Sequence, residues 1–189
     1  LIQDVTTHYG GLDILVTNIA GPPLTDFQHV TDEEWHAAHN TILTSCIHLI
    51  KTALPYLRDS TSASISTITS FTAKQIMSGY LLSNVFRPAV IGLTKSLSKE
   101  LGKFNIRVNS ILPGFTMTER LRATTQKKGD AAHISWQEQV ESLAKSVPLG
   151  RIAEPEEFGK VATFLVSSAA SYVTGVMLQV DGGFCDGLY

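Results

Sequence analysis

The sequence predicts an α/β fold, a Rossmann-like doubly wound parallel sheet with helices on both faces in three α/β/α layers. Four short apolar or β-branched segments alternate along the chain with longer segments of helical pattern. Strands that alternate with helices usually pair in parallel, because each return to the same end of the sheet needs a long crossover. With 189 residues, 43% of them apolar, the chain is long enough to form one domain over 1–189.

The first half of the chain contains two predicted strands separated by a long helix. Asp13–Asn18 reads DILVTN, a short apolar run typical of a buried strand. Thr31 or Asp32 would cap a helix that runs to about Leu57, with acidic residues in its first turn. Ser64–Thr69 is rich in β-branched residues and predicts the second strand.

The second half repeats this alternation twice. Pro88 lacks a backbone N–H, so the next helix is expected to begin near Asn84 or to be distorted in its first turn, and Gly102 should stop it. The predicted elements are a helix over 84–101, a strand over 106–112, a polar helical region over 118–147 with a break at 127–130, a helix from Pro155 to about Ser167, and a strand over 175–180.

Charge and composition narrow the possible partners. The net charge is −2 and no basic stripe occurs, which argues against nucleic acid and anionic membranes. No apolar run is long enough to cross a bilayer, so we expect a cytoplasmic protein. Cys46 and Cys185 fit no metal-ligand spacing and are interpreted as idle thiols of a reducing compartment, without a metal site.

Six segments in order resemble motifs of the short-chain dehydrogenase/reductase family. Each segment alone has a structural explanation, such as a turn or a strand-end hydroxyl, but the shared order and spacing make coincidence improbable. The segments are LDILVTNIAG over 12–21, Trp35 with Asn40, Ile68–Ser70, IRVNSILPGFTMT over 106–118, GRIAEPEE over 150–157 and YVTGVMLQVDGG over 172–183.

The resemblance implies an NAD- or NADP-dependent oxidoreductase that interconverts a carbonyl and an alcohol on a small or moderately apolar substrate. It implies that Ser70 orients the substrate oxygen, that Asn40 holds a catalytic water, and that residues 118–147 form a substrate lid. Thr118 and the preceding turn would hold the nicotinamide carboxamide. The implied cofactor-binding residues are Asn18, Ala20, Gly21, Arg87, Pro113, Gly114, Phe115, Thr116 and Thr118. The family's helices also imply a homodimer or homotetramer.

The catalytic tyrosine and lysine of the family are replaced in this chain. Counted from Ser70, the motif Tyr-x-x-x-Lys falls on Ser83 and Arg87. A tyrosine whose pKa is lowered can shuttle a proton near neutrality, whereas a serine needs a partner base. An arginine stays charged, so it can clamp ribose hydroxyls but relays protons poorly.

Two functions from different classes are consistent with this change. The first is an oxidoreductase in which Ser70 orients the substrate and either water or Tyr80 supplies the proton. Tyr80 could equally pack its loop as an aromatic plug. The second is a noncatalytic dinucleotide- or ligand-binding protein on the same fold.

The start of the chain also departs from the family pattern. Leu1 already lies within a helical segment, and the glycine-rich phosphate turn of the family does not precede the strand at Asp13. We therefore expect that the first βαβ units are missing from this sequence. A strand as apolar as Asp13–Thr17 is expected to have neighbours at both of its edges, so either another chain or an absent N-terminal segment should pair with it.

Overall fold

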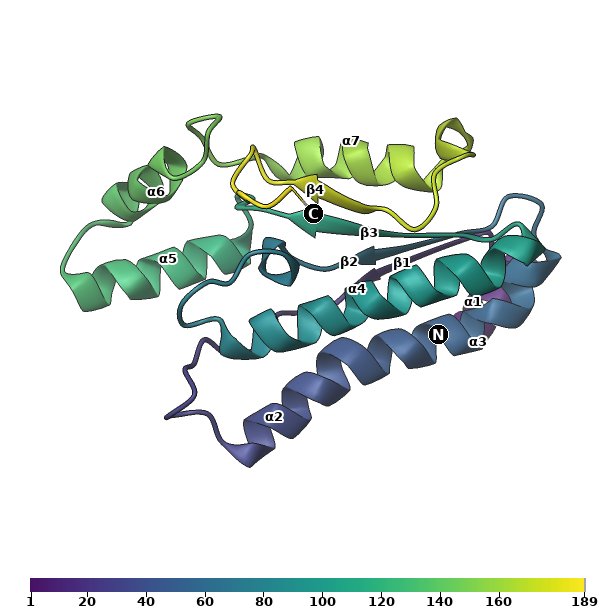
Figure 1. Cartoon of the computed structure of the whole chain (residues 1–189), viewed down its shortest axis with the longest axis horizontal. Helices are drawn as coiled ribbons and strands as arrows, with labels where there is room; N and C mark the ends of the chain where they lie inside the picture. Colours follow the sequence, from purple (N-terminus) through teal and green to yellow (C-terminus); the bar gives the residue numbers. More distant parts are fainter. Residues whose placement is uncertain (189) are drawn as a thin grey trace.

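Four parallel strands form one sheet in the order β1-β2-β3-β4 (Figure 1). The computed structural model describes residues 1–188, apart from the side chains at 128 and 131. The strands are β1 Ile14–Asn18, β2 Ser64–Ile68, β3 Arg107–Pro113 and β4 Met177–Val180. The helices are α1 Ile2–Tyr9, α2 Asp32–Ala38, α3 Ser45–Asp59, α4 Leu81–Leu101, α5 Glu119–Ala132, α6 Trp136–Lys145 and α7 Pro155–Val166. The predicted α/β fold with a parallel sheet is confirmed.

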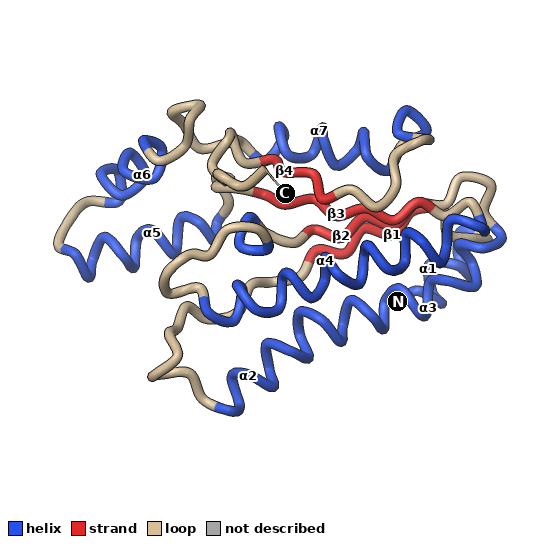
Figure 2. The backbone as a smooth tube through the Cα atoms, viewed as in Figure 1, coloured by secondary structure: helices blue, strands red, loops and turns tan. Residues whose placement is uncertain are grey.

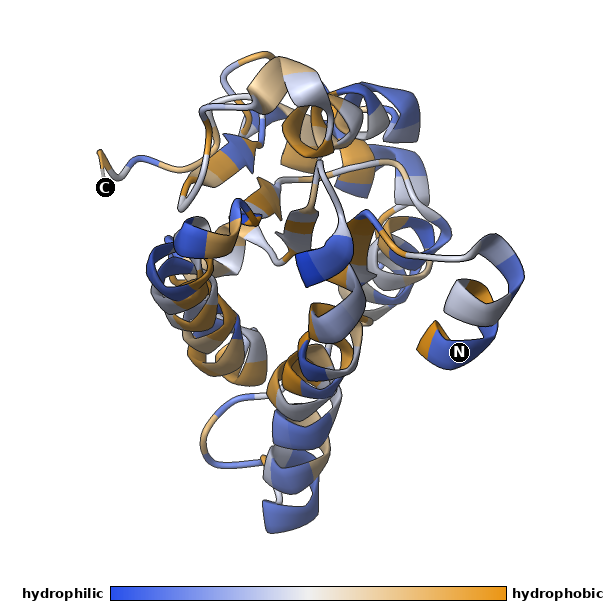
Figure 3. Cartoon of the chain, turned by 90° about the vertical axis from the view of Figure 1, so that its right-hand side faces the viewer, coloured by the Kyte–Doolittle hydropathy of each residue, from blue (hydrophilic) through white to orange (hydrophobic). Residues whose placement is uncertain are grey.

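Helices cover the sheet from both sides, which gives three layers (Figures 1 and 2). α3 and α4 contact the strands from one face, whereas α7 contacts β2 and β3 from the other. Hydrophobic residues concentrate on the strands and on the helix sides that face them (Figure 3). None of the helices in the described part of the chain is long and apolar enough to cross a membrane.

The first strand lies at an edge of the sheet. In the described residues β1 pairs with β2 alone, in the register Leu15 to Ile65. Leu15 is buried against the α3 and α4 side, but Ile14 and Val16, which alternate with it, are 43% and 44% exposed. The second neighbour expected for this strand is therefore absent from the described sheet.

The helix that carries Ser83 and Arg87 begins earlier than expected. α4 starts at Leu81 rather than Asn84, and Pro88 lies inside it. The Asn84 side chain donates to the Met77 carbonyl at 2.9 Å and accepts from the Met77 N–H, which ties the preceding loop to the first turn. Leu82 is fully buried. Tertiary packing thus outweighs the single hydrogen bond that proline removes.

The predicted break at 127–130 is wrong, because α5 runs through it to Ala132. Gly129 is buried, and a Cβ there would lie 2.8 Å from the carbonyl oxygen of Ile134 and 3.4 Å from Gln139 of α6. The glycine therefore permits close approach of the next segment instead of ending the helix. The chain turns at His133, which adopts a left-handed conformation with φ of 57°.

The predicted helix over 32–57 contains a π-helical segment. α2 and α3 are joined without a loop by the π-helix His39–Thr44, and the helical structure continues to Asp59. Thr31 is the N-cap, in a capping box with Glu34. π-Helical turns are rare and cost hydrogen-bond geometry, so they are often found near functional sites.

Candidate active site

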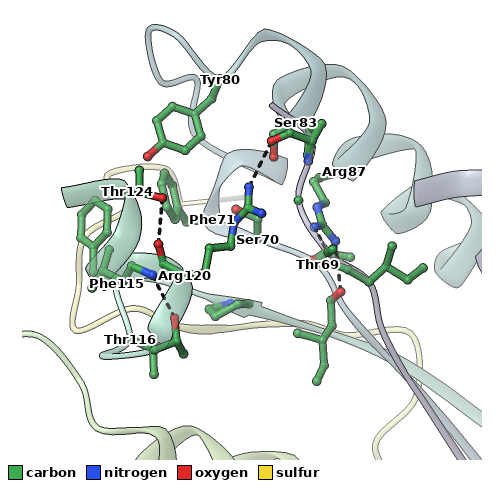
Figure 4. A pocket seen from close by; sticks show the side chains of 18 of the residues that line it. Thr69, Ser70, Phe71, Tyr80, Ser83, Arg87, Phe115, Thr116, Arg120 and Thr124 are labelled. Atoms are coloured by element: carbon green, nitrogen blue, oxygen red, sulfur yellow. Dashed lines mark hydrogen bonds between the residues drawn. The ribbon is translucent and has the colours of Figure 1, made fainter. Parts of the chain in front are cut away.

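A cavity of about 540 Å³ opens beyond the carboxyl ends of β1, β2 and β3. Its walls come from the segment after β1, from the start of α4, from the turn after β3 and from α5 (Figure 4). All nine predicted cofactor-binding residues line it, together with Ser70, Tyr80 and Ser83. The topology thus brings together most of the residues that the sequence singled out.

Arg87 is buried and bridges two strand ends. It is 5% exposed, and its guanidinium donates to the carbonyl of Ile19 at 3.0 Å and to that of Ile68 at 3.3 Å. Burial, followed by the nearby charge of Arg120, lowers the pKa of Arg87 to about 10, so it remains charged at neutral pH. Its two terminal nitrogens therefore hold the backbone after β1 and at the end of β2.

Three hydroxyl-bearing residues link the end of β2 to α4. The Ser70 Oγ accepts a bond from the N–H of Thr72 at 3.1 Å, and the hydroxyl oxygens of Thr72 and Ser83 are 2.8 Å apart. Because Ser70 accepts through its oxygen, its own proton can point to a ligand. Ser83 is 7% exposed and is occupied with Thr72, so it is not set up as a proton shuttle.

Tyr80 lies at the N-terminus of α4 and lines the cavity. Its ring is directed towards Thr124 of α5, and its centroid is 6.3 Å from that of Phe71 (Figure 4). Tyr80 packs on an aromatic ring, as expected of an aromatic plug, and it also lines the cavity, as a proton donor would have to.

The structure does not bring Asn40 to the cavity. Asn40 is exposed on the π-helix, and its side-chain oxygen lies 3.4 Å from the Nδ1 atom of His39. The neighbouring residue on the core side is Ile42, which is fully buried. Asn40 lies in the helical segment that the sequence motif predicted, but the helical phase turns its side chain to solvent.

The turn after β3 is held by the end of β4. The Gly114 N–H donates to the carbonyl of Val180 at 2.9 Å, and a Cβ at Gly114 would lie 2.6 Å from Asp181 Cα. Only glycine allows this approach. Thr118 ends the turn and caps α5, where its hydroxyl accepts from the Leu121 N–H at 3.2 Å.

Two buried polar atoms in the cavity wall lack a partner among the described residues, Arg87 Nε and Thr116 Oγ1. Buried polar groups of folded proteins are nearly always hydrogen-bonded, so such atoms are matched to a ligand or to water. Both belong to residues predicted to contact the nicotinamide end of a dinucleotide. The cavity also has hydroxyl-bearing lining residues, Ser70, Thr116 and Thr118 among them, which fit the ribose hydroxyls and carboxamide of that group.

The sequence reasoning missed several residues of the cavity wall. The most consequential is Arg120, whose side chain reaches from α5 across the cavity and donates to the Pro22 carbonyl at 3.1 Å (Figure 4). In sequence it looks the same as Arg122, an exposed arginine two positions later. The other unpredicted lining residues include Pro22, Pro23, Leu24, Phe71 and Thr124.

Comparisons with known proteins agree on one family. A family model described as Enoyl-(Acyl carrier protein) reductase matches residues 1–185. A 3-oxoacyl-(acyl-carrier-protein) reductase from Chlamydia trachomatis is 34% identical over 182 residues, which cover 96% of this chain and 69% of that protein. The chain belongs to the short-chain dehydrogenase/reductase family. The resemblance drawn from the sequence motifs is confirmed.

Two solved structures are close in shape to this chain. L-sorbose reductase from Gluconobacter frateurii, complexed with NADPH and L-sorbose, has a TM-score of 0.93 and 29% identity, over 99% of this chain and 72% of its own. An NADPH-bound short-chain oxidoreductase from Pseudomonas aeruginosa has a TM-score of 0.89 and 28% identity, over 98% and 70%. The latter is described as containing an atypical catalytic center.

Proposed function

We propose that this chain binds NAD or NADP in the cavity and interconverts a carbonyl and an alcohol without the family's tyrosine and lysine. The observation that carries the proposal is the position of Ser70, whose hydroxyl proton can point into a cavity with unpartnered polar atoms. The NADPH-bound relatives support the cofactor class.

The proposed roles follow from the contacts of each residue. The Ser70 hydroxyl donates to the substrate oxygen and orients the carbonyl. The turn at Pro113–Thr118 holds the carboxamide, and Arg87 positions the two strand ends that frame the site. A bound nicotinamide supplies or accepts the hydride. Tyr80, or water at the cavity mouth, exchanges the proton with the substrate oxygen.

A second function is favoured by the same geometry around α4. Ser83 is bonded to Thr72, and Arg87 donates to two backbone carbonyls, so neither side chain is arranged for proton transfer. This arrangement suits a protein that binds a dinucleotide or a related ligand and does not turn it over.

The test of the first proposal is a pair of serine variants. We expect the chain to bind NADH or NADPH saturably by fluorescence and to reduce a carbonyl, with Ser70→Ala lowering kcat/KM roughly 100-fold through loss of the oriented donor. Ser96→Ala, an exposed serine on α4, is the matched control and should leave the rate unchanged. A further loss in Tyr80→Phe would assign the proton to Tyr80.

Two outcomes separate the alternatives. Equal rates for Ser70→Ala and Ser96→Ala would refute the role of Ser70. Saturable dinucleotide binding without turnover of any carbonyl or alcohol would favour the noncatalytic function.

The remaining features of the proposal concern the whole protein. We propose that α5 and α6, within 118–147, act as the substrate lid, and that the molecule is a homodimer or homotetramer in the cytoplasm. The lid is supported by the apolar side of α6, where Val140, Leu143 and Ala144 pack on the cluster of Phe71 and Phe115, two residues that line the cavity. The free thiols of Cys46 and Cys185 suit a reducing compartment.

A further inference from the structure

Arg120 is the second residue of α5, and its side chain turns back over the cavity (Figure 4). Its Nη2 atom donates to the carbonyl of Pro22 and lies 2.7 Å from the position of a Cβ on Gly21. A helix that starts beside the turn after β3 is thus connected, through one arginine, to the loop after β1.

The cavity carries two cations and no acidic residue among its lining residues. Arg87 and Arg120 are its only charged lining residues in the described part of the chain, and neither forms an ion pair there. They are close enough that the charge of Arg120 contributes to the lowered pKa of Arg87. An anion between or beside them would offset this repulsion.

Of the two arginines, Arg120 is the one that a ligand can reach. Arg87 is almost fully buried and has both terminal nitrogens on backbone carbonyls. Arg120 is exposed at the cavity, and among the described residues its side chain makes one hydrogen bond, to a neutral carbonyl. A guanidinium bonds a carboxylate through two parallel N–H groups, which is stronger than one bond to a neutral oxygen.

The wall beside Arg120 is apolar and aromatic. Phe71 and Phe115 line the cavity with ring centroids 5.3 Å apart, and Phe184 packs behind them at 5.1 and 4.9 Å. Leu121 packs against this cluster, and Leu24 is a further apolar residue of the cavity lining. A ligand that suits both features has an anionic group and an apolar body.

We propose that Arg120 selects a carbonyl substrate that bears a carboxylate on an apolar or aromatic body, and that the carboxylate replaces the Pro22 carbonyl as the partner of its guanidinium. Arg120 is then a specificity-determining residue of the site. This inference rests on the proposed function where it describes the ligand as a carbonyl substrate. The preference for a carboxylate can be measured by binding, without turnover.

The test is the equilibrium binding of benzoylformate and of its methyl ester, an uncharged analogue with the same carbonyl and ring. By calorimetry we expect the chain to bind the acid roughly ten-fold or more tightly than the ester. Arg120→Gln should lower affinity for the acid by that factor and leave the ester unchanged, whereas Arg120→Lys should restore part of the preference. Arg122→Gln removes the same charge from the same helix, but Arg122 lies over the Trp136 ring at 5.3 Å, so this variant should behave as the unaltered chain.

The outcomes that would overturn the inference are distinct from those that concern the proposed function. Equal affinity for acid and ester, the absence of binding to either, or the same loss in Arg122→Gln would refute it. An NADH affinity that falls in Arg120→Gln, with the acid preference intact, would assign the arginine to the dinucleotide phosphates and also refute it. If the acid is preferred but never reduced with NADH or NADPH, the binding inference stands and the proposed oxidoreductase activity fails.

Discussion

At the scale of single residues, the shape of the Arg87 side chain decides which contacts this position makes. A lysine presents one compact ammonium, whereas the planar fork of Arg87 has two terminal nitrogens that bond two carbonyls at once. Those carbonyls belong to Ile19 and Ile68, on the segments that frame the cavity. Arg87 therefore holds together the two backbone segments that frame the site.

We expect Arg87→Met to lower the free energy of unfolding by about 1–3 kcal/mol, because two carbonyls lose a charged donor. The measurement is urea unfolding followed by circular dichroism. Lys95→Met is the matched control, since Lys95 lies on the same helix and donates to a single carbonyl, that of Gly175, from an exposed position. Its effect should be smaller than 1 kcal/mol. An Arg87→Met variant as stable as the unaltered chain would mean that the desolvation of the guanidinium cancels its bonds.

At the scale of elements, buried hydroxyl groups set the position of α4. The hydroxyl oxygens of Thr67 on β2, Thr94 on α4 and Ser110 on β3 form a triangle with distances of 2.6, 2.9 and 3.0 Å. All three side chains are buried, so the contacts are not exchanged with water. This network fixes the helix against two strands and so orients Ser83 and Arg87 at its other end.

The N-terminus of α7 supplies a prediction about pH. Glu157 bonds both terminal nitrogens of Arg151, at 2.6 and 2.7 Å, and the Glu154 N–H at 2.9 Å. The pair with Arg151, and then the backbone bond, lower the pKa of Glu157 to about 2. A carboxyl whose pKa is lowered on folding stabilises the fold above its ordinary pKa of 4.5, and loses this contribution as the pH falls towards 2.

We therefore expect Glu157→Gln to lower the Tm at pH 7 and to have a progressively smaller effect below about pH 4.5. Thermal unfolding of both proteins across this range measures the difference. Glu156 carries the same charge but forms no ion pair with Arg151 among the described residues, so Glu156→Gln serves as the control. A Tm difference that is constant between pH 7 and pH 3 would contradict the assignment of the stabilisation to this ion pair.

At the scale of the whole molecule, the site lies at the carboxyl-terminal ends of the strands and is completed by segments that are far apart in sequence. Residues 18–24, 68–71, 80–87 and 113–124 meet there because parallel strands place all their carboxyl ends on one side. A second, smaller cavity lies near Ile14 and Arg107, at the opposite ends of the strands, and it too carries polar side chains, among them Asn105.

The proposed homo-oligomer is tested on the outer side of α4. Val85 is 44% exposed there, although the same helix buries Leu82, Phe86 and Val90. If two copies associate through α4, Val85→Glu should dissociate them, because an unpaired carboxylate would be buried at the interface. Sedimentation should show a dimer or tetramer for the unaltered chain and a smaller species for the variant. Tyr172→Glu, at a fully exposed position away from α4, is the control. Sedimentation of the unaltered chain as a monomer would refute the proposed homo-oligomer.

The sequence by itself determined the order and type of most elements and the class of the protein. Apolar and β-branched runs, such as those at Asp13–Asn18 and Ser64–Thr69, encode strands by local composition. Family motifs identified the cavity residues because strand ends and turns keep their spacing along the chain. The same spacing predicts that Ser83 and Arg87 stand where the family has tyrosine and lysine.

Only the tertiary structure decided how those side chains are used. Helical phase turned Asn40 to solvent, packing against α6 kept Gly129 inside a helix, and two strand ends captured the guanidinium of Arg87. Arg120 and Arg122 are alike in sequence, yet one crosses the cavity and the other lies over Trp136. Such outcomes depend on contacts between segments distant along the chain, and local sequence carries no information on these distances.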